Sequence, residues 1–157
     1  MLSISVEEFL IWKKKQLSKG GNLQSFSVLL DCIGGLSASD LNLININLKE
    51  NLLLKRNLLF LESIWNDHVL NSHPIQYLCG ITFWRDLKLK VTNKVLIPRP
   101  ETELIVDIIF NIFRKKSEKL FFAELGTGSG AISIALALAY PFSEGVATDI
   151  DLSLIHI

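Results

Sequence analysis

The sequence lacks an excess of charge of either sign and lacks any long uncharged apolar run. Lys and Arg together number 16, as do Asp and Glu, so the formal net charge is zero. Such a balance argues against an overall electrostatic attraction to nucleic acid or to an anionic membrane surface. The longest uncharged apolar run covers residues 131–140, about half of what a helix needs to cross a bilayer. We therefore expect neither direct nucleic-acid binding nor a transmembrane helix.

Cysteine is also scarce. The two that occur, Cys32 and Cys79, are neither spaced as a disulfide framework nor set in a metal-binding motif. Near the N-terminus, Glu7 and Glu8 precede any basic cluster, which is the wrong order for a secretory signal peptide. These features predict reduced thiols in a cytoplasmic protein that holds no metal.

Apolar surface is plentiful. Hydrophobic residues make up 49% of the chain and charged residues 20%, a composition that supports a buried core and excludes a disordered tail. A length of 157 residues suits one domain, or a small domain plus part of a second. Because the pattern changes near residue 74, we expect three parts: a helical partner-docking domain over 1–73, a β-hairpin linker over 74–100, and an α/β domain over 101–157.

The first part has a helical pattern. Ser5 and Glu8 have the spacing of a capping box, which opens a helix to about residue 18. A second helix is expected over about 24–33, and a longer helical stretch over about 40–70. Within the longer stretch, apolar side chains recur at three- and four-residue steps, which is typical of a core-facing stripe; they are Leu54, Leu58, Leu61 and Trp65. We therefore predict a small helical bundle.

The other two parts alternate strands with helices. Residues 82–91 alternate apolar with polar side chains and 95–97 are apolar, so we predict a β-hairpin with its turn near Thr92 and Asn93. The pattern beyond it predicts a helix over about 101–113, a strand over 120–125, a helix over 129–140 and a strand over 145–149. The last three form a βαβ unit, which implies a parallel sheet with helices on its faces.

The segment most informative about chemistry joins the two strands of this unit. Three glycines, Gly126, Gly128 and Gly130, follow the first strand at alternate positions, and a helix starts immediately afterwards. Glycines let the backbone turn tightly and approach a ligand, and the first N–H groups of a helix stay unpaired and point outwards. Asp149 ends the next strand, where a carboxylate can accept hydrogen bonds from both hydroxyls of a ribose. The arrangement predicts a site for a nucleoside-containing cofactor.

Two cofactor classes compete for this site. Gly126, Gly128 and Ala131 also satisfy the looser dinucleotide fingerprint of an NAD-linked oxidoreductase. Glu124, at the end of the first strand, weighs against NAD because its carboxylate would repel a pyrophosphate and would suit an ammonium group. The extra Gly130 keeps the backbone open for a compact ligand. S-adenosyl-L-methionine, which carries an ammonium group and a ribose diol, matches the two acids.

Three stretches together resemble a known family. They are residues 74–80 (Pro-Ile-Gln-Tyr-Leu-Cys-Gly), 96–103 (Leu-Ile-Pro-Arg-Pro-Glu-Thr-Glu) and 124–130 (Glu-Leu-Gly-Thr-Gly-Ser-Gly). They look like the HemK-type protein-(glutamine-N5) methyltransferases, which modify the glutamine of the Gly-Gly-Gln loop in peptide chain release factors. The resemblance implies S-adenosyl-L-methionine as cofactor, release factors as partners, and a partial class I (Rossmann-like) methyltransferase fold. The second stretch is specific to the family, whereas the glycine loop alone indicates a class I methyltransferase.

The resemblance also implies roles for individual residues. Those implied to bind the cofactor are Glu124, Gly126, Thr127, Gly128, Ser129, Gly130 and Asp149. Those implied to lie over the active site and contact the substrate are Arg99, Glu101 and Thr102. For these three a purely structural role stays open, in which Thr102 or Glu101 caps a helix and Arg99 makes an ion pair.

The family's catalytic motif, Asn-Pro-Pro-Tyr, does not occur in the 157 residues. In the family it orients the glutamine amide, and good orientation can supply about 7–11 kcal/mol. We therefore expect a C-terminally truncated fragment that does not transfer methyl groups by itself. Residues 152–157 lack the pattern of a following helix. The alternatives are an NAD-linked oxidoreductase fragment and a non-catalytic fragment that docks a release factor.

Overall fold

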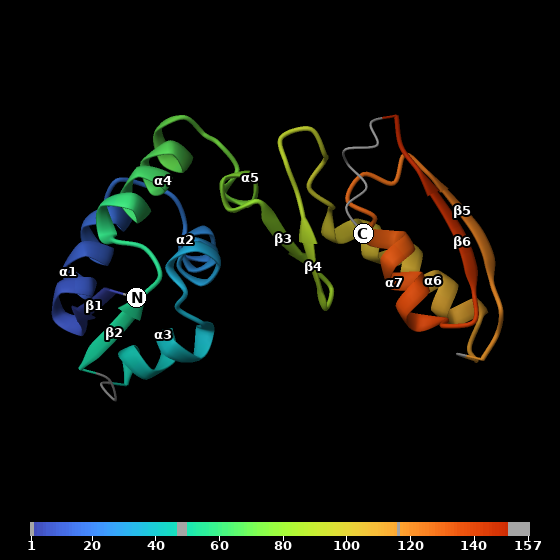
Figure 1. The fold of residues 1–157 in the computed structure, drawn as a ribbon, viewed down its shortest axis with the longest axis horizontal. Coiled ribbons are helices and arrows are strands. Elements are labelled where there is room, and N and C mark those ends of the chain that lie inside the picture. The colour runs from blue at the N-terminus through green and yellow to red at the C-terminus, as the bar shows by residue number, and fades with distance from the viewer. Residues whose placement is uncertain (1, 47–49, 116, 151–157) are drawn as a thin grey trace. The chain divides into compact units, whose positions relative to one another are not determined.

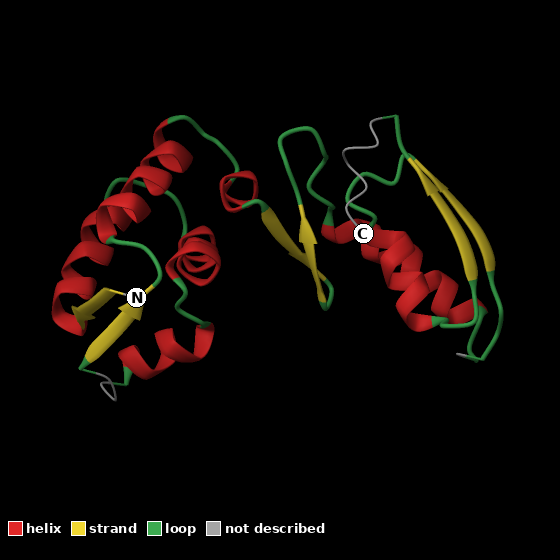
Figure 2. Cartoon of the chain, in the orientation of Figure 1, coloured by secondary structure: helices red, strands yellow, loops and turns green. Residues whose placement is uncertain are grey.

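The computed structural model describes residues 2–46, 50–115 and 117–150 (Figure 1). Residues 152–157, for which no helix pattern was found, lie outside this range. The chain separates into two compact units, Met1–Cys79 and Gly80–Ile157. Both contain helices and short strands (Figure 2), and the strands of the described part form two-stranded sheets. The expected mixture of helices and strands is confirmed.

The first unit is largely helical but contains a sheet. Its elements are β1 (Leu2–Ser5), α1 (Val6–Leu17), α2 (Leu23–Leu29), the π-helix η1 (Leu30–Gly34), α3 (Ala38–Asn45), β2 (Asn51–Leu54), α4 (Leu58–Leu70) and α5 (Ile75–Cys79). Strands β1 and β2 pair antiparallel, with Leu2 opposite Leu54. The predicted helical bundle therefore also contains a two-stranded sheet, which was not predicted. The stretch expected to be helical from about 40 to 70 is two helices separated by β2.

The core of the first unit confirms much of the predicted stripe. Leu54, Leu61 and Trp65 are buried, and Leu58 is partly buried against the same cluster. One of the two hydrogen bonds of the predicted capping box is present: the Ser5 hydroxyl accepts from the Glu8 N–H at 3.2 Å. This bond satisfies one of the N–H groups that the start of α1 would otherwise leave unpaired.

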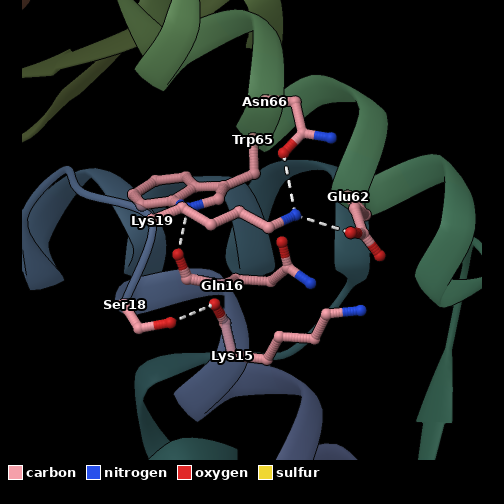
Figure 3. A network of polar contacts seen from close by, with 7 residues as sticks. All are labelled: Lys15, Gln16, Ser18, Lys19, Glu62, Trp65 and Asn66. Atoms are coloured by element: carbon pink, nitrogen blue, oxygen red, sulfur yellow. Dashed lines mark hydrogen bonds and ion pairs between the residues drawn. The ribbon is translucent and has the colours of Figure 1, made fainter.

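Polar contacts fasten the end of α1 to α4, as Figure 3 shows. The buried Trp65 Nε1–H donates to the Gln16 carbonyl at 3.0 Å. Lys19 Nζ lies 2.6 Å from Glu62 Oε1 and 3.0 Å from Asn66 Oδ1. Because the three partners, Glu62, Trp65 and Asn66, lie within about one turn of α4, these bonds fix how the end of α1 packs against α4 within the unit.

The second unit begins with a hairpin and continues into a βαβ unit. Its elements are β3 (Ile81–Trp84), β4 (Leu87–Lys90), the 3₁₀-helix η2 (Pro100–Thr102), α6 (Glu103–Ile112), β5 (Phe121–Leu125), α7 (Ala131–Ala139) and β6 (Glu144–Thr148). Strands β5 and β6 pair in parallel, with Phe121 opposite Glu144 and Leu125 opposite Thr148. The predicted order of the last four elements is confirmed, with bounds shifted by one or two residues at most ends.

The hairpin exists, but its predicted turn near Thr92 and Asn93 was wrong. Ile81 pairs with Lys90 and Trp84 with Leu87, so the chain reverses at Arg85 and Asp86, inside the segment expected to be one strand. Residues 95–97 form no strand. Arg85 adopts a φ of +50°, a conformation that favours glycine, and nothing in its residue type signals a turn.

Helices α6 and α7 cover one face of the β5–β6 sheet (Figure 1). Phe122 packs against a buried cluster of Leu120, Leu136 and Tyr140, against which residues of α6 and α7 also pack. Residues on the opposite face stay exposed; Phe121 is 72% exposed, Leu125 82% and Val146 60%. Parallel sheets are normally covered on both faces, so the described residues supply one of the two layers.

In the described ranges no single helix is long and apolar enough to cross a membrane; Leu23–Gly34 and Ala38–Ile44 reach that length and apolar composition only together, as a pair bent by 110°. Across the same ranges no group of three or more His, Cys, Asp or Glu side chains could hold a metal ion.

Candidate functional site

The glycine loop connects β5 to α7 in a strained backbone path. Gly126, Gly128 and Gly130 have φ values of +72°, +55° and +76°. Side chains with a Cβ rarely adopt such angles, which explains why glycine occupies all three positions. The N–H groups of Gly126 and Thr127 both donate to the Thr148 carbonyl, at 2.8 and 3.0 Å. The loop is therefore fastened to the carboxyl end of the neighbouring strand β6.

The loop is open on one side and packed on another. A Cβ added to Gly126 would meet no atom within 4 Å, whereas one added to Gly128 would lie 3.2 Å from Val95 Cγ2. Gly126 therefore borders open space, and the chain after the hairpin packs against Gly128. Such a bare backbone edge admits a ligand that a side chain would exclude.

Glu124, the fourth residue of β5, takes the place of an N-cap side chain for α7. The N-cap residue of this helix is Gly130, which has no side chain to offer. Glu124 Oε2 instead accepts from the Ser133 N–H at 3.0 Å, from the Ser133 hydroxyl, and from Thr127 Oγ1 at 2.7 Å. A carboxylate beside the positive end of a helix is favourably placed. Its other oxygen, Oε1, has no hydrogen bond within the described part of the chain.

Ser133 is a site residue that the sequence analysis missed. It lies in the first turn of α7, and it is buried. Its hydroxyl and its N–H both bind Glu124, so it fixes the direction of that carboxylate. In the sequence, a serine in the first turn of a helix that begins with glycine only weakly indicates a site residue. Its role becomes visible once the structure places α7 beside β5.

Asp149 reaches back to the glycine loop from the end of β6. Its Oδ2 accepts from the Gly128 N–H at 2.7 Å, and its Oδ1 accepts from the Ile150 N–H at 2.7 Å. The two acids selected from the sequence, Glu124 and Asp149, therefore both hydrogen-bond to residues of the loop or of the helix that follows it. Thr127, Ser129 and Gly130 complete this loop.

The start of α7 offers further donors. Among the described residues, no acceptor is recorded for the N–H groups of Ala131 and Ile132. Unpaired N–H groups at a helix start carry partial positive charge and bind electronegative ligand atoms. Donors at the helix start, an open glycine edge and two carboxylates suit a ligand that has hydroxyl and ammonium groups. The residues thus fit the predicted nucleoside-containing cofactor.

The other predicted residues lie where η2 leads into α6. The Arg99 carbonyl accepts from Trp84 Nε1–H at 3.0 Å and from the Thr102 N–H at 3.1 Å, so the backbone is held against the hairpin. Thr102 occupies the N-cap position of α6, but its side chain makes no capping bond. Arg99 and Glu101 are exposed, and no ion pair of Arg99 is recorded within the described ranges.

An apolar cluster connects this passage to the glycine loop. Trp84 and Leu89 of the hairpin, Val106 of α6, and Ala131 and Ala135 of α7 are all buried in it. Since Ala131 directly follows the loop, the hairpin, α6 and the loop are parts of one packed unit. The structure thereby anchors the segment around Arg99 and the cofactor loop in the same core.

No protein-family model matches the chain, but several curated proteins are similar to it. A "Release factor glutamine methyltransferase" of Prochlorococcus marinus is 44% identical over 149 residues, which are 92% of this chain and 50% of that protein. A protein of the same name from Synechocystis sp. is 49% identical over 80 residues, 49% of this chain and 27% of that protein. Another from Bacillus anthracis is 38% identical over 135 residues, 85% of this chain and 46% of that protein.

The chain spans about half the length of the curated relatives that it matches most fully. The similarity covers both compact units, since 92% of the chain aligns with the relative from Prochlorococcus marinus. The resemblance that the three motifs indicated is confirmed: this chain is a relative of the release factor glutamine methyltransferases, the HemK-type family.

Proposed function

We propose that the protein carrying this chain methylates the glutamine side chain in the Gly-Gly-Gln loop of peptide chain release factors, with S-adenosyl-L-methionine as the methyl donor. The observation that carries the proposal is the glycine loop with Glu124 and Asp149 fixed beside it. It occurs in a chain that is 44% identical to a release factor glutamine methyltransferase over 149 residues. We further propose that β5, α7 and β6 open a Rossmann-like class I domain.

Different residues of the described part would bind different groups of the cofactor. Glu124 is held through Oε2, so Oε1 is left to accept from an ammonium group. Asp149 is oriented by the Gly128 and Ile150 N–H groups, and its remaining lone pairs can accept from two ribose hydroxyls. The open backbone at Gly126 lets the ligand lie close to the loop. When bound, the cofactor supplies an electrophilic methyl group on a sulfonium.

The same geometry disfavours a dinucleotide. The helix start alone would favour phosphate. The carboxylate of Glu124, fixed beside that helix start, would repel a pyrophosphate bound over the loop. An NAD-linked reaction is therefore the weaker proposal.

For the substrate, we propose that Arg99, Glu101 and Thr102 contact the release factor. Their backbone is fixed by the bonds from Trp84 and Thr102 to the Arg99 carbonyl. The Arg99 and Glu101 side chains are exposed, and Thr102 is half-buried, so all three can meet a partner. We propose that the helical first unit docks the same release factor.

The proposed reaction needs more than these 157 residues. The Asn-Pro-Pro-Tyr motif, which the family resemblance assigns to orienting the glutamine amide, does not occur in them. We therefore propose that this chain binds cofactor, and that methyl transfer requires the motif to be supplied. We propose that the protein acts in the cytoplasm.

A chimera tests this function. The chain is fused to the part of the Prochlorococcus marinus relative that lies beyond the matched residues, and is incubated with S-adenosyl-L-methionine and a release factor. Peptide mass spectrometry should show one added methyl group on the Gly-Gly-Gln glutamine, and none in a release factor with glutamate there. An unmodified glutamine with a folded chimera would refute the proposal. Methylation by the 157-residue chain alone would refute the need for the motif.

A further inference from the structure

The first unit brings the chain's two cysteines together. Cys32 lies in η1, and Cys79 is the last residue of α5. Residues of α2, which leads directly into η1, contact α5, and the Cys32 thiol is close enough to the Cys79 thiol to raise its pKa. Both side chains are partly buried and neither is in a disulfide. Since the chain has two cysteines, each is the other's one candidate partner for an intramolecular disulfide.

Cys32 also faces a cavity that carries positive charge. It lines an open cavity of about 430 Å³ together with Ile33, Lys55, Arg56 and Phe60. The Lys55 N–H donates to the Gly34 carbonyl at 2.8 Å, which fixes the lysine beside η1. The Arg56 guanidinium lies over the Phe60 ring, 5.4 Å from its centroid. Neighbouring cations stabilise a thiolate, and an open cavity admits a small oxidant.

Cys79 has a different environment. It packs against the apolar core of the unit. This burial, together with the adjacent Cys32, raises the pKa of the Cys79 thiol to about 12. Because the reactive form of cysteine is the thiolate, the two cysteines are unequal: Cys32 lines the cavity together with Lys55 and Arg56, whereas the raised pKa keeps Cys79 protonated at neutral pH.

We propose that Cys32 and Cys79 are a redox pair that forms a reversible disulfide when hydrogen peroxide enters the cavity, with Cys32 reacting first and Cys79 resolving. In the first step the Cys32 thiolate attacks one peroxide oxygen and the O–O bond breaks. Cys32 becomes a sulfenic acid, and the leaving oxygen departs as water after taking up a proton. In the second step the Cys79 sulfur displaces the sulfenic hydroxyl, which takes the Cys79 proton and leaves as a second water.

Mass spectrometry of the 157-residue chain tests the proposal. After treatment with hydrogen peroxide, the intact protein should lose two hydrogen atoms, and a non-reducing digest should contain one peptide joined through Cys32 and Cys79. Dithiothreitol should restore the original mass. Failure to form this peptide while a sulfenic or higher acid accumulates would overturn the proposal, as would disulfides found only between two chains.

Variants separate the two roles. In Cys79→Ser, a sulfenic acid on Cys32 should accumulate and be trapped by dimedone. In Cys32→Ser, Cys79 should react with peroxide several-fold more slowly than Cys32 does in Cys79→Ser. Lys55→Gln with Arg56→Gln should slow disulfide formation, whereas Lys14→Gln, in the last turn of α1 and outside the cavity, should not. Equal peroxide rates for the two single-cysteine variants, both showing unchanged circular dichroism, would contradict the assigned order.

Discussion

At the scale of single residues, the glycine loop was the most predictable part of the molecule. Alternate glycines between a strand and a helix have a direct physical cause, namely backbone angles that residues with a Cβ avoid, and all three have positive φ. The positions of Asp149 and Glu124 were predictable for a different reason: each lies at or next to the end of a strand that adjoins the loop. Ser133 was not, since its bond to Glu124 depends on how α7 lies against β5.

Two glycine substitutions test this explanation of the loop. Gly126→Ala introduces a Cβ at φ +72° into open space, and should lower the free energy of unfolding by about 1–2 kcal/mol. Gly128→Ala meets Val95 Cγ2 at 3.2 Å as well, so its loss should be larger. Urea denaturation of both variants measures the difference. Equal losses would show that the Val95 contact does not restrict Gly128.

At the scale of elements, local patterns succeeded where pairing partners are near in sequence. The βαβ unit was predicted within one or two residues at most ends because each element has its own period. The sheet of β1 and β2 was not predicted because three α-helices and η1 separate its two strands in the sequence. In addition, the leucine-rich sequence of β2 is equally typical of a helix. The hairpin turn was misplaced because residues 82–91 were interpreted as one alternating strand, although the adjacent polar residues Arg85 and Asp86 interrupt the alternation where the chain reverses.

Adjacent phenylalanines in β5 test which face of the sheet is covered. Phe122 packs against the same buried cluster as residues of α6 and α7 and lies over Gly145, leaving no room for a Cβ there, so Phe122→Ala should cost about 2–3 kcal/mol of stability. Phe121 is 72% exposed and contacts the Lys119 ammonium, so Phe121→Ala should cost less than about 1 kcal/mol. Thermal and urea unfolding measure both. A reversed order would mean that the helices lie on the other face.

The contact between α1 and α4 predicts a pH dependence. The hydrogen bond from Lys19 holds the pKa of Glu62 below its ordinary value of 4.5. The folded state thus favours the ionised carboxylate, so the pair contributes at neutral pH and its contribution declines as the pH falls below 4.5. Lys19→Gln should lower stability at pH 7 by roughly 0.5 kcal/mol.

Measuring the free energy of unfolding at low pH provides the matching control. The difference between Lys19→Gln and the natural chain should shrink as the pH falls through the lowered pKa of Glu62. Lys14→Gln removes a charge from the last turn of α1, five residues before Lys19, without a contact to Glu62, so its effect should not change over that range. A difference that persists unchanged at low pH would assign the stability of Lys19 to something other than this pair.

At the scale of the whole molecule, sequence patterns identified the kind of protein better than the way its parts assemble. The chain matches relatives about twice its length, and one face of the β5–β6 sheet is exposed in the described residues. The residues of a motif such as the glycine loop are contiguous in the sequence, so the kind of site that they form could be predicted directly. The covering of a sheet face depends on residues distant in sequence, which no local pattern specifies.

We propose that the glycine loop, Glu124 and Asp149 form a site for S-adenosyl-L-methionine. Isothermal titration of the 157-residue chain with S-adenosylhomocysteine, the demethylated product, tests it most directly, with NAD titrated in parallel. We predict binding of S-adenosylhomocysteine, at least about tenfold weaker in Asp149→Asn because hydrogen bonds to a charged acceptor contribute about 1.5–3 kcal/mol, and no binding of NAD. Binding of NAD in preference, or affinity for S-adenosylhomocysteine that Asp149→Asn leaves unchanged, would contradict the account.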